Sequence, residues 1–161
     1  MATLYDIKPW FQSLLRPKVA DLAAHGITAN EVTLAALAMS CAVGLLVWLF
    51  PNSSLVLLLL AVALGVRMAL NAIDGLLARE HGQESPLGAL LNELSDLASD
   101  AALYLPLALV TGVPATLAVI AAVLGLIVEG AGLAAMLIGA PRGYQGPMGK
   151  SDRAFAFGLL A

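Results

Sequence analysis

Six charged residues interrupt stretches of this sequence that are otherwise apolar: Arg67, Asp74, Glu93, Asp96, Asp100 and Glu129. An ionised side chain costs at least about 2.5 to 3.5 kcal/mol at the centre of a bilayer. Each of these residues must therefore be paired, hydrated or bound to a metal ion. Carboxylate oxygens suit Mg²⁺, Mn²⁺ and Ca²⁺, so the acidic residues indicate a metal-binding site within the apolar part of the chain.

Basic residues accompany this acidic group at or near one side of the membrane. They are Arg67, Arg79, Arg142, Lys150 and Arg153. Arginine and lysine hold phosphate oxygens through charge-assisted hydrogen bonds. Metal ligands beside basic groups favour chemistry on a phosphate ester, although each basic residue taken alone is more often a determinant of membrane topology.

The spacing of the polar residues places them on two helical faces. At about 100° per residue, one face of the segment 55–79 carries Arg67, Asn71, Asp74, Gly75 and Ala78. In the segment 86–110, an arc of about 100° carries Asn92, Glu93, Asp96 and Asp100. A short turn joins the two segments, so we expect the two polar faces to meet.

The composition defines the kind of protein that must position these residues. Of 161 residues, 60% are hydrophobic and 12% are charged, against about 25% charged in an ordinary soluble domain. This excludes a soluble globular protein and predicts an all-α integral membrane protein, a multi-span helical bundle. The net charge of -3 gives no sign of a nucleic-acid partner.

Apolar stretches separated by turn residues predict the membrane spans. Complete spans are expected over 31–50, 55–79, 86–110 and 115–138. Thr28 or Asn30 is expected to cap the first span, and Pro86 suits the first turn of the third. Residues 141–150 form the longest expected loop, and a further helix begins near Ser151 with too few residues to cross. The chain 1–161 is thus expected to be one membrane domain without its C-terminal end.

An amphipathic helix is expected to precede the first span. In residues 7–25, apolar side chains recur at spacings of three and four among basic ones, which is typical of a helix in the membrane interface. The connections 51–54 and 111–114 have no basic residue, unlike the N-terminal segment and the other connections. The positive-inside rule therefore predicts that the N-terminus and the polar site face the cytoplasm.

A known motif covers the centre of the polar region. The segment 71–96 reads N-A-I-D-G-L-L-A-R, eight further residues, and G-A-L-L-N-E-L-S-D. It resembles the signature of the CDP-alcohol phosphatidyltransferases, D-x2-D-G-x2-A-R-x8-G-x3-D-x3-D. The residues that match this signature are Asp74, Gly75, Ala78, Arg79, Gly88 and Asp96.

Two elements outside the signature extend the resemblance over nearly the whole chain. Residues 28–33, T-A-N-E-V-T, resemble the P-N-x-x-T start of the family's first span, and Gly149 with Lys150 resembles its basic G-K element. Members of the family have six spans, so the resemblance implies further spans beyond those counted here.

The resemblance implies a metal-dependent enzyme of phospholipid biosynthesis in a bacterial inner membrane. Such an enzyme transfers the phosphatidyl group of CDP-diacylglycerol to an alcohol and releases CMP. Asp96 takes the position of the proposed base. In the family the first three signature aspartates bind two divalent ions and the fourth contributes. Here Asp74, Asn71, Asn92 and Asp96 take these positions, for one or two ions of Mg²⁺ or Mn²⁺. The residues implied to line the cytidine diphosphate are Asp74, Gly75, Ala78, Arg79, Gly88 and Thr33.

Two positions depart from the signature. Asn71 and Asn92 stand where the family has its first and third aspartates, a form (N-A-[IL]-D-G) typical of a bacterial branch of the family. An asparagine oxygen can still ligate a hard cation, but two negative charges are lost. Glu93, Asp100 and Glu129 could restore that charge, and Glu93 and Asp100 flank Asp96 as additional candidate metal ligands.

The lost carboxylates keep two other functions open. The first is a catalytically impaired relative that binds the CDP-lipid or serves as a partner subunit. The second is a proton or cation pathway, since acids inside a membrane often mark one. The enzyme is the favoured interpretation.

The acceptor is expected to be a small alcohol. Residues expected to contact it or its phosphate are Arg67, Arg142, Lys150, Arg153 and Glu129. These basic groups favour glycerol 3-phosphate over serine or a neutral polyol. Family members are generally homodimers, and small residues in the fourth span would allow close helix packing: Gly125, Gly130, Gly132 and Gly139.

Overall fold

The computed structural model describes residues 8–137, and the chain in this range is built from helices. They are α1 (Lys8–Ala24), α2 (Ala29–Leu49), α3 (Ser54–Glu80), α4 (Pro86–Tyr104), the short 3-10 helix η2 (Leu105–Leu109) and α5 (Ala115–Leu137). The predicted all-α fold is confirmed. The loop expected over 141–150 and the helix expected from Ser151 lie outside the described residues.

The third predicted span differs from the structure at its C-terminal end. The α-helix ends at Tyr104, and the chain continues as η2. Pro106 lies in η2 and has no backbone N–H to donate to an α-helical hydrogen bond. The predicted segment 86–110 is therefore one α-helix followed by a tighter turn of helix.

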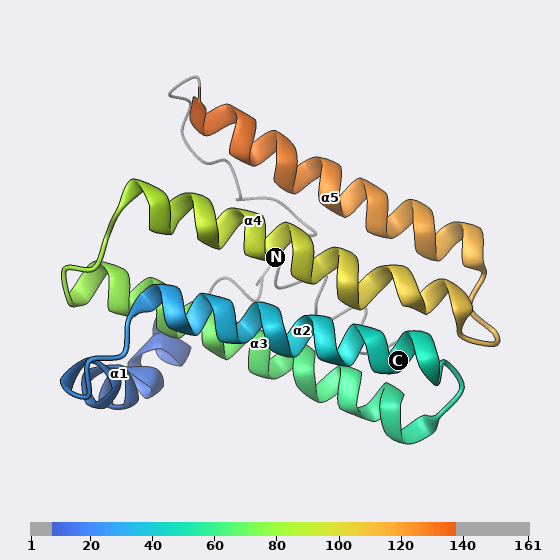
Figure 1. Ribbon diagram of the computed structural model, residues 1–161, viewed down its shortest axis with the longest axis horizontal. Helices are drawn as coiled ribbons and strands as arrows, with labels where there is room; N and C mark the ends of the chain where they lie inside the picture. The colour runs from blue at the N-terminus through green and yellow to red at the C-terminus, as the bar shows by residue number, and fades with distance from the viewer. Residues whose placement is uncertain (1–7, 138–161) are drawn as a thin grey trace.

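Helices α2, α3, α4 and α5 lie lengthwise beside one another, and α1 lies across one end of them (Figure 1). The chain reverses direction between successive long helices, so α2 and α4 run the same way. Helix α2 packs against both α3 and α4, and α5 packs against α4 and η2. Helices α3 and α4 make no comparable backbone contact. Helix α2 is therefore the element that sets their relative position.

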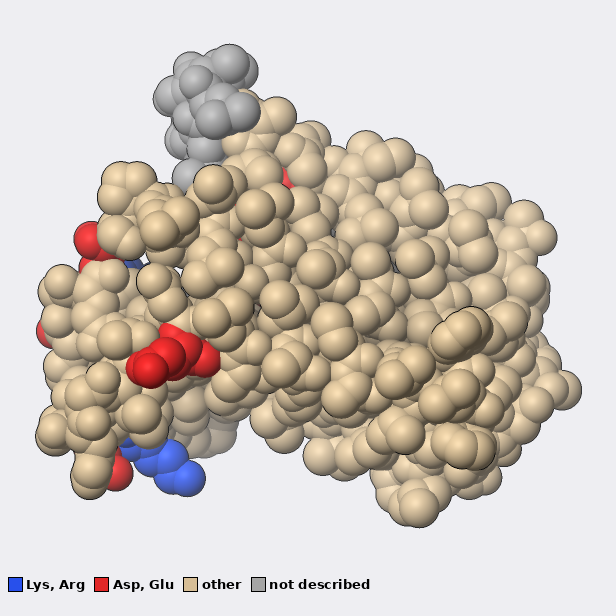
Figure 2. Space-filling view, viewed as in Figure 1, with Lys and Arg blue, Asp and Glu red and all other residues tan. Residues whose placement is uncertain are grey.

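Within residues 8–137, three helices are long and apolar enough to cross a membrane: Ala29–Leu49, Ser54–Glu80 and Ala115–Ala134. Their outer faces are covered by exposed leucine, isoleucine and valine, for example Leu58 and Leu124. Helix α4 carries Glu93, Asp96 and Asp100 and is less apolar. On the face seen in Figure 2, charged atoms gather mainly at the end where α1 lies, and most of the remaining surface is uncharged.

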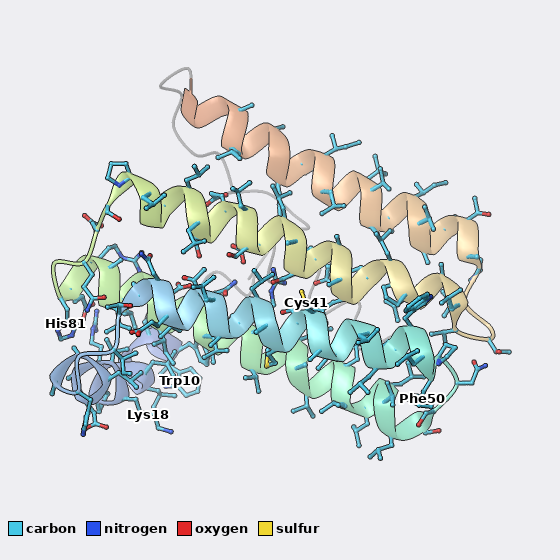
Figure 3. All side chains as sticks on the ribbon, viewed as in Figure 1. Trp10, Lys18, Cys41, Phe50 and His81 are labelled. Atoms are coloured by element: carbon cyan, nitrogen blue, oxygen red, sulfur yellow. The ribbon has the colours of Figure 1, made fainter. Side chains whose placement is uncertain are left out.

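Helix α1 is attached to the end of α3. Val19 is fully buried against this end of the bundle, and the Arg16 guanidinium forms an ion pair with Glu80 at 3.1 Å. Trp10 and Lys18 of α1 lie at the same end of the molecule as His81, and Phe50 lies at the opposite end (Figure 3). The apolar and basic side chains of α1 are thus concentrated at one end of the long helices.

Helices α2 and α4 approach closely because small residues lie at two contact points. A Cβ atom added at Gly44 would lie 2.1 Å from the carbonyl oxygen of Ala102. One added at Gly88 would lie 2.9 Å from the side-chain oxygen of Asn30. The number of residues between Gly44 and Ala102 equals the number between Asn30 and Gly88. This is expected for two parallel helices that pack in a single register. One contact lies near the start and the other near the end of both helices, so this packing holds α2 and α4 together along most of their length.

Side chains from two segments fix the start of α2. Thr28 caps the helix through the reciprocal capping box with Glu31, which confirms one of the two predicted caps. Gln83, in the turn between α3 and α4, accepts a hydrogen bond from the Ala29 amide at 2.6 Å and donates one to the Ile27 carbonyl at 3.4 Å. The turn itself relies on Gly82, whose φ is +67°. Gln83 therefore joins the α3–α4 turn to α2.

We expect Gln83→Ala to lower the free energy of unfolding by about 1 to 3 kcal/mol, because the partly buried Ala29 amide loses its acceptor. Reversible unfolding of the purified protein in mixed detergent micelles measures this loss. Glu84→Ala, at the exposed neighbouring position, is the matched control and should change the stability by no more than about 0.5 kcal/mol. Equal losses in the two variants would contradict the role given to Gln83.

Candidate functional site

The polar faces of α3 and α4 meet through Arg67. Its guanidinium donates to Asp100, and its Nη2 donates to the side chain of Asp96 at 3.2 Å and to the Asp96 backbone carbonyl at 3.1 Å. One helical turn away on α3, Asn71 Nδ2 donates to the same Asp96 oxygen, Oδ1, at 3.0 Å. The predicted meeting of the two polar faces is therefore confirmed.

This cluster is well shielded from solvent. The side chains of Arg67 and Asp100 are each only 3% exposed, and that of Asp96 is 15% exposed. Buried charges of opposite sign are tolerated when they are paired and hydrogen-bonded. Because the backbones of α3 and α4 do not pack closely, the long arginine side chain spans the distance between them.

Asp74, on the next turn of α3, is held by α2. The Thr33 hydroxyl lies 2.9 Å from Asp74 Oδ2 and 3.0 Å from the carbonyl oxygen of Ala29. Both Thr33 and Asp74 are buried. The threonine of the segment 28–33 thus orients the one carboxylate that the first half of the signature retains.

Thr33→Val should lower the free energy of unfolding by about 1.5 to 3 kcal/mol, because a buried carboxylate loses a hydrogen-bond donor at nearly constant side-chain volume. Ser40→Ala is the control: Ser40 is as deeply buried, but its hydroxyl bonds to the carbonyl oxygen of Ala36 in its own helix. Chemical denaturation in detergent should show the larger loss for Thr33→Val. A loss in Thr33→Val that does not exceed that of Ser40→Ala would show that the bond to Asp74 contributes little.

Arg79 lies over a glycine of its own helix. A Cβ atom at Gly75 would lie 3.0 Å and 3.1 Å from the two terminal nitrogens of Arg79. The absence of a side chain at Gly75 therefore leaves room for the guanidinium beside α3. The exposed Arg79 places a positive charge near the cytoplasmic end predicted for this helix.

The remaining predicted site residues lie on α4, on α5 or outside the described range. Asn92 is partly buried on α4, and Ala78 is partly buried on α3. Glu93 is buried on α4, and Glu129 is buried on the inner side of α5, in line with Ala118, Ala122 and Gly125. Arg142, Lys150, Arg153 and Gly139 lie outside the described residues.

The structure adds contacts that the sequence did not reveal. The pairing of Arg67 with two carboxylates was not predicted: Arg67 was expected to contact an acceptor phosphate, and Asp100 a metal. The role of Gln83 was also missed, because a polar residue in a short turn carries no signal of a long-range partner. The pairing of Arg67 with the carboxylates could have been inferred from one feature of the sequence: Arg67 and Asn71 are one helical turn apart, on the face expected to meet the acids of α4.

The candidate metal ligands of this region come from both α3 and α4. Within residues 8–137, no three side chains of histidine, cysteine, aspartate or glutamate come close enough together to hold a metal ion. The candidate oxygen donors are of mixed kind: the carboxylates of Asp74 on α3 and Asp96 on α4, and the amide of Asn71, which donates to Asp96.

Comparisons with known proteins agree with the motif. The family model for CDP-alcohol phosphatidyltransferase matches residues 26–160. The inner membrane protein YnbA of Escherichia coli (strain K12) is 52% identical over 157 residues, which cover 98% of this chain and 78% of that protein. Comparison with solved structures gave no match. The chain therefore belongs to the CDP-alcohol phosphatidyltransferase family.

Proposed function

We propose that this protein transfers the phosphatidyl group of CDP-diacylglycerol to a small alcohol and releases CMP, as a step of phospholipid synthesis. The observation that carries the proposal is the hydrogen bond from Asn71 to Asp96. It joins the first and last positions of the family signature, which lie on different helices. The two halves of the signature therefore belong to one site.

The donor set suits a hard divalent ion. Mg²⁺ is usually bound through one or two carboxylates together with substrate phosphates and water, and Mn²⁺ accepts the same oxygen ligands. The residues that would hold the ion are Asp74, Asp96, Asn71 and Asn92. Glu93 of α4 is an additional candidate ligand. When bound, the ion would neutralise charge on the transferring phosphate and on the departing CMP.

Asp96 is the proposed base. The acceptor hydroxyl oxygen forms a bond to the phosphorus that carries diacylglycerol, while the bond from that phosphorus to the bridging oxygen breaks and its electron pair leaves with CMP. The proton of the hydroxyl passes to the Asp96 carboxylate. Arg67 and Asn71, which both donate to Asp96 Oδ1, fix the orientation of this carboxylate.

The donor nucleotide is proposed to lie along the signature of α3. Gly75 and Ala78 have small side chains or none, which leaves space there. The Arg79 guanidinium beside Gly75 would donate hydrogen bonds to a phosphate oxygen of the diphosphate. Gly88 is close to Asn30 and Ser85, so it lets α4 begin near the same site. Thr33 acts through Asp74.

The acceptor phosphate is proposed to meet the basic residues that follow α5. Arg67 is already paired with Asp96 and Asp100. This leaves Arg142, Lys150 and Arg153, together with Glu129 of α5, as the proposed contacts. Glycerol 3-phosphate remains the acceptor that this charge would favour.

The proposed orientation follows from the distribution of charge. Helix α1, with Trp10 and Lys18 at the end of the bundle (Figure 3), would lie in the cytoplasmic interface of the inner membrane. The N-terminus and the site would then face the cytoplasm, where CDP-linked substrates enter. We further propose that the protein acts as a homodimer, with Gly130 of α5, where an added Cβ atom meets nothing within 4 Å among the described residues, as a site of close helix packing.

The test is CMP release by the purified protein in lipid nanodiscs with Mg²⁺ or Mn²⁺, CDP-diacylglycerol and a panel of alcohols. Release that depends on one alcohol, with glycerol 3-phosphate expected to be the best, would support the proposal. Asn71 and Asn92 favour one other function, a relative that binds the CDP-lipid without turning it over. Thermal protection by CDP-diacylglycerol with no CMP release for any alcohol would support that function instead.

A further inference from the structure

The Arg67 guanidinium occupies a position between the acidic residues of α4. It donates to Asp100 and to Asp96, and its side chain is 3% exposed. Arginine keeps its positive charge under all ordinary conditions. A permanent cation is therefore already present among the carboxylates of the site.

The site also carries fewer negative charges than the family signature provides. Asn71 and Asn92 are neutral, so the signature contributes only the carboxylates of Asp74 and Asp96. Asp100, which contacts Arg67, adds one further negative charge, and Arg67 removes one. The carboxylates of Asp74, Asp96 and Asp100 together with the Arg67 guanidinium carry a net charge of two negative units, which a single divalent ion neutralises.

Asn71 fits this arrangement in a way that aspartate would not. Its Nδ2 donates to Asp96 Oδ1 at 3.0 Å, and Arg67 donates to the same oxygen at 3.2 Å. A carboxylate at position 71 would offer a second negative group at hydrogen-bond distance from Asp96 and would need another cation between the two. The amide makes that cation unnecessary.

We propose that Arg67 is a resident cation that replaces one divalent ion, so that the site binds one Mg²⁺ or Mn²⁺ per chain where the family signature implies two. The inference rests on the proposed function, because it concerns the same site. Asp74 and Asp96 would hold the ion, and Arg67 pairs with Asp96 and Asp100. Arg67 is thus a positioning residue.

The number of bound ions tests the inference independently of catalysis. Full-length protein in nanodiscs is titrated with Mn²⁺ in the presence of CDP-diacylglycerol, and free Mn²⁺ is counted from its electron paramagnetic resonance signal. We expect one tightly bound ion per chain. Two bound ions, or none, would overturn the inference.

Variants extend the test. Arg67→Met removes the resident charge and should raise the count from one ion to two, whereas Arg67→Lys keeps the charge and should leave it at one. Arg16→Met, which removes an arginine that pairs with Glu80 outside the site, is the matched control and should also leave the count at one. A count of one in folded Arg67→Met would contradict the replacement. If Arg67→Met does not fold, the number of Mn²⁺ ions bound by the unmodified protein still tests the inference.

CMP release is measured in the same preparations, so that the ion count and the proposed phosphatidyl transfer are tested separately. Two bound ions with CMP release would overturn the inference and leave the proposed function intact. One bound ion without CMP release for any alcohol would overturn the proposed function and leave the ion count standing.

Discussion

Asp96→Asn is expected to lower the turnover number for CMP release by about 10²- to 10⁴-fold, the usual contribution of a general base. Asparagine has nearly the same size as aspartate but cannot accept the proton of the acceptor hydroxyl. The fold should persist, because Arg67 keeps its ion pair with Asp100. Initial rates at saturating acceptor, followed by chromatographic detection of CMP, measure the effect.

The control for this variant is Asp21→Asn on α1. The Asp21 side chain is 73% exposed and lies beside His25, away from the polar cluster of α3 and α4. Its substitution should leave the turnover number unchanged within about twofold. Turnover in Asp96→Asn equal to that of the Asp21 variant would remove Asp96 from its role as base.

Gly44→Ala is expected to be the most destabilising of the small substitutions in the long helices. The new methyl group would lie 2.1 Å from the Ala102 carbonyl oxygen and 2.7 Å from its carbonyl carbon. These are backbone atoms, so relief requires α2 and α4 to move apart. Overpacking of this kind costs about 1 to 3 kcal/mol, and unfolding in mixed micelles measures it.

Gly65→Ala provides a matched helix-interior control. A Cβ atom at Gly65 meets nothing within 4 Å among the described residues. Alanine favours a helix over glycine by about 0.5 to 1 kcal/mol, so this variant should be as stable as the original protein or slightly more so. Similar losses at both glycines would show that the α2–α4 contact is not tightly packed.

CMP release should fall with Gly44→Ala, because the same contact positions Asp96 relative to Thr33 and Asp74.

The helices could be predicted from the sequence because each carries its own signals. The apolar run before Pro51 and Asn52 predicted the end of α2, and Ser85 with Pro86 marks the start of α4, where the structure has the N-cap and first turn. The C-terminal end of α4 was missed. Hydropathy continues unchanged through Leu105 and Leu107, and only Pro106 indicates that the α-helix cannot continue.

The candidate site was predictable in outline but not in its pairings. Helical periodicity placed Arg67 and Asn71 on one face and Asp96 and Asp100 on another, and the structure brings these faces together. Periodicity does not give the separation between two helices or the partner of a long side chain. The sequence therefore suggested a phosphate contact for Arg67, whereas the structure gives it two carboxylates.

Contacts of α2 were the hardest to predict. The bond from Thr33 to Asp74 and the contact of Gly44 with Ala102 join residues that are far apart in the chain. Nothing in the local pattern around Gly44 distinguishes it from Gly65, which has open space around it. The difference arises from helix packing, which depends on the whole bundle.

The most direct test of the central claim is the identity of the lipid product. Protein in nanodiscs is incubated with Mg²⁺, CDP-diacylglycerol and the alcohol that best supports CMP release, and the lipids are analysed by mass spectrometry. We predict a new lipid whose mass is that of the phosphatidyl group esterified to the alcohol, formed in equal amount with CMP, and formed at least about 10²-fold more slowly by Asp96→Asn. CMP accompanied only by phosphatidic acid, or no new lipid with any alcohol, would contradict phosphatidyl transfer.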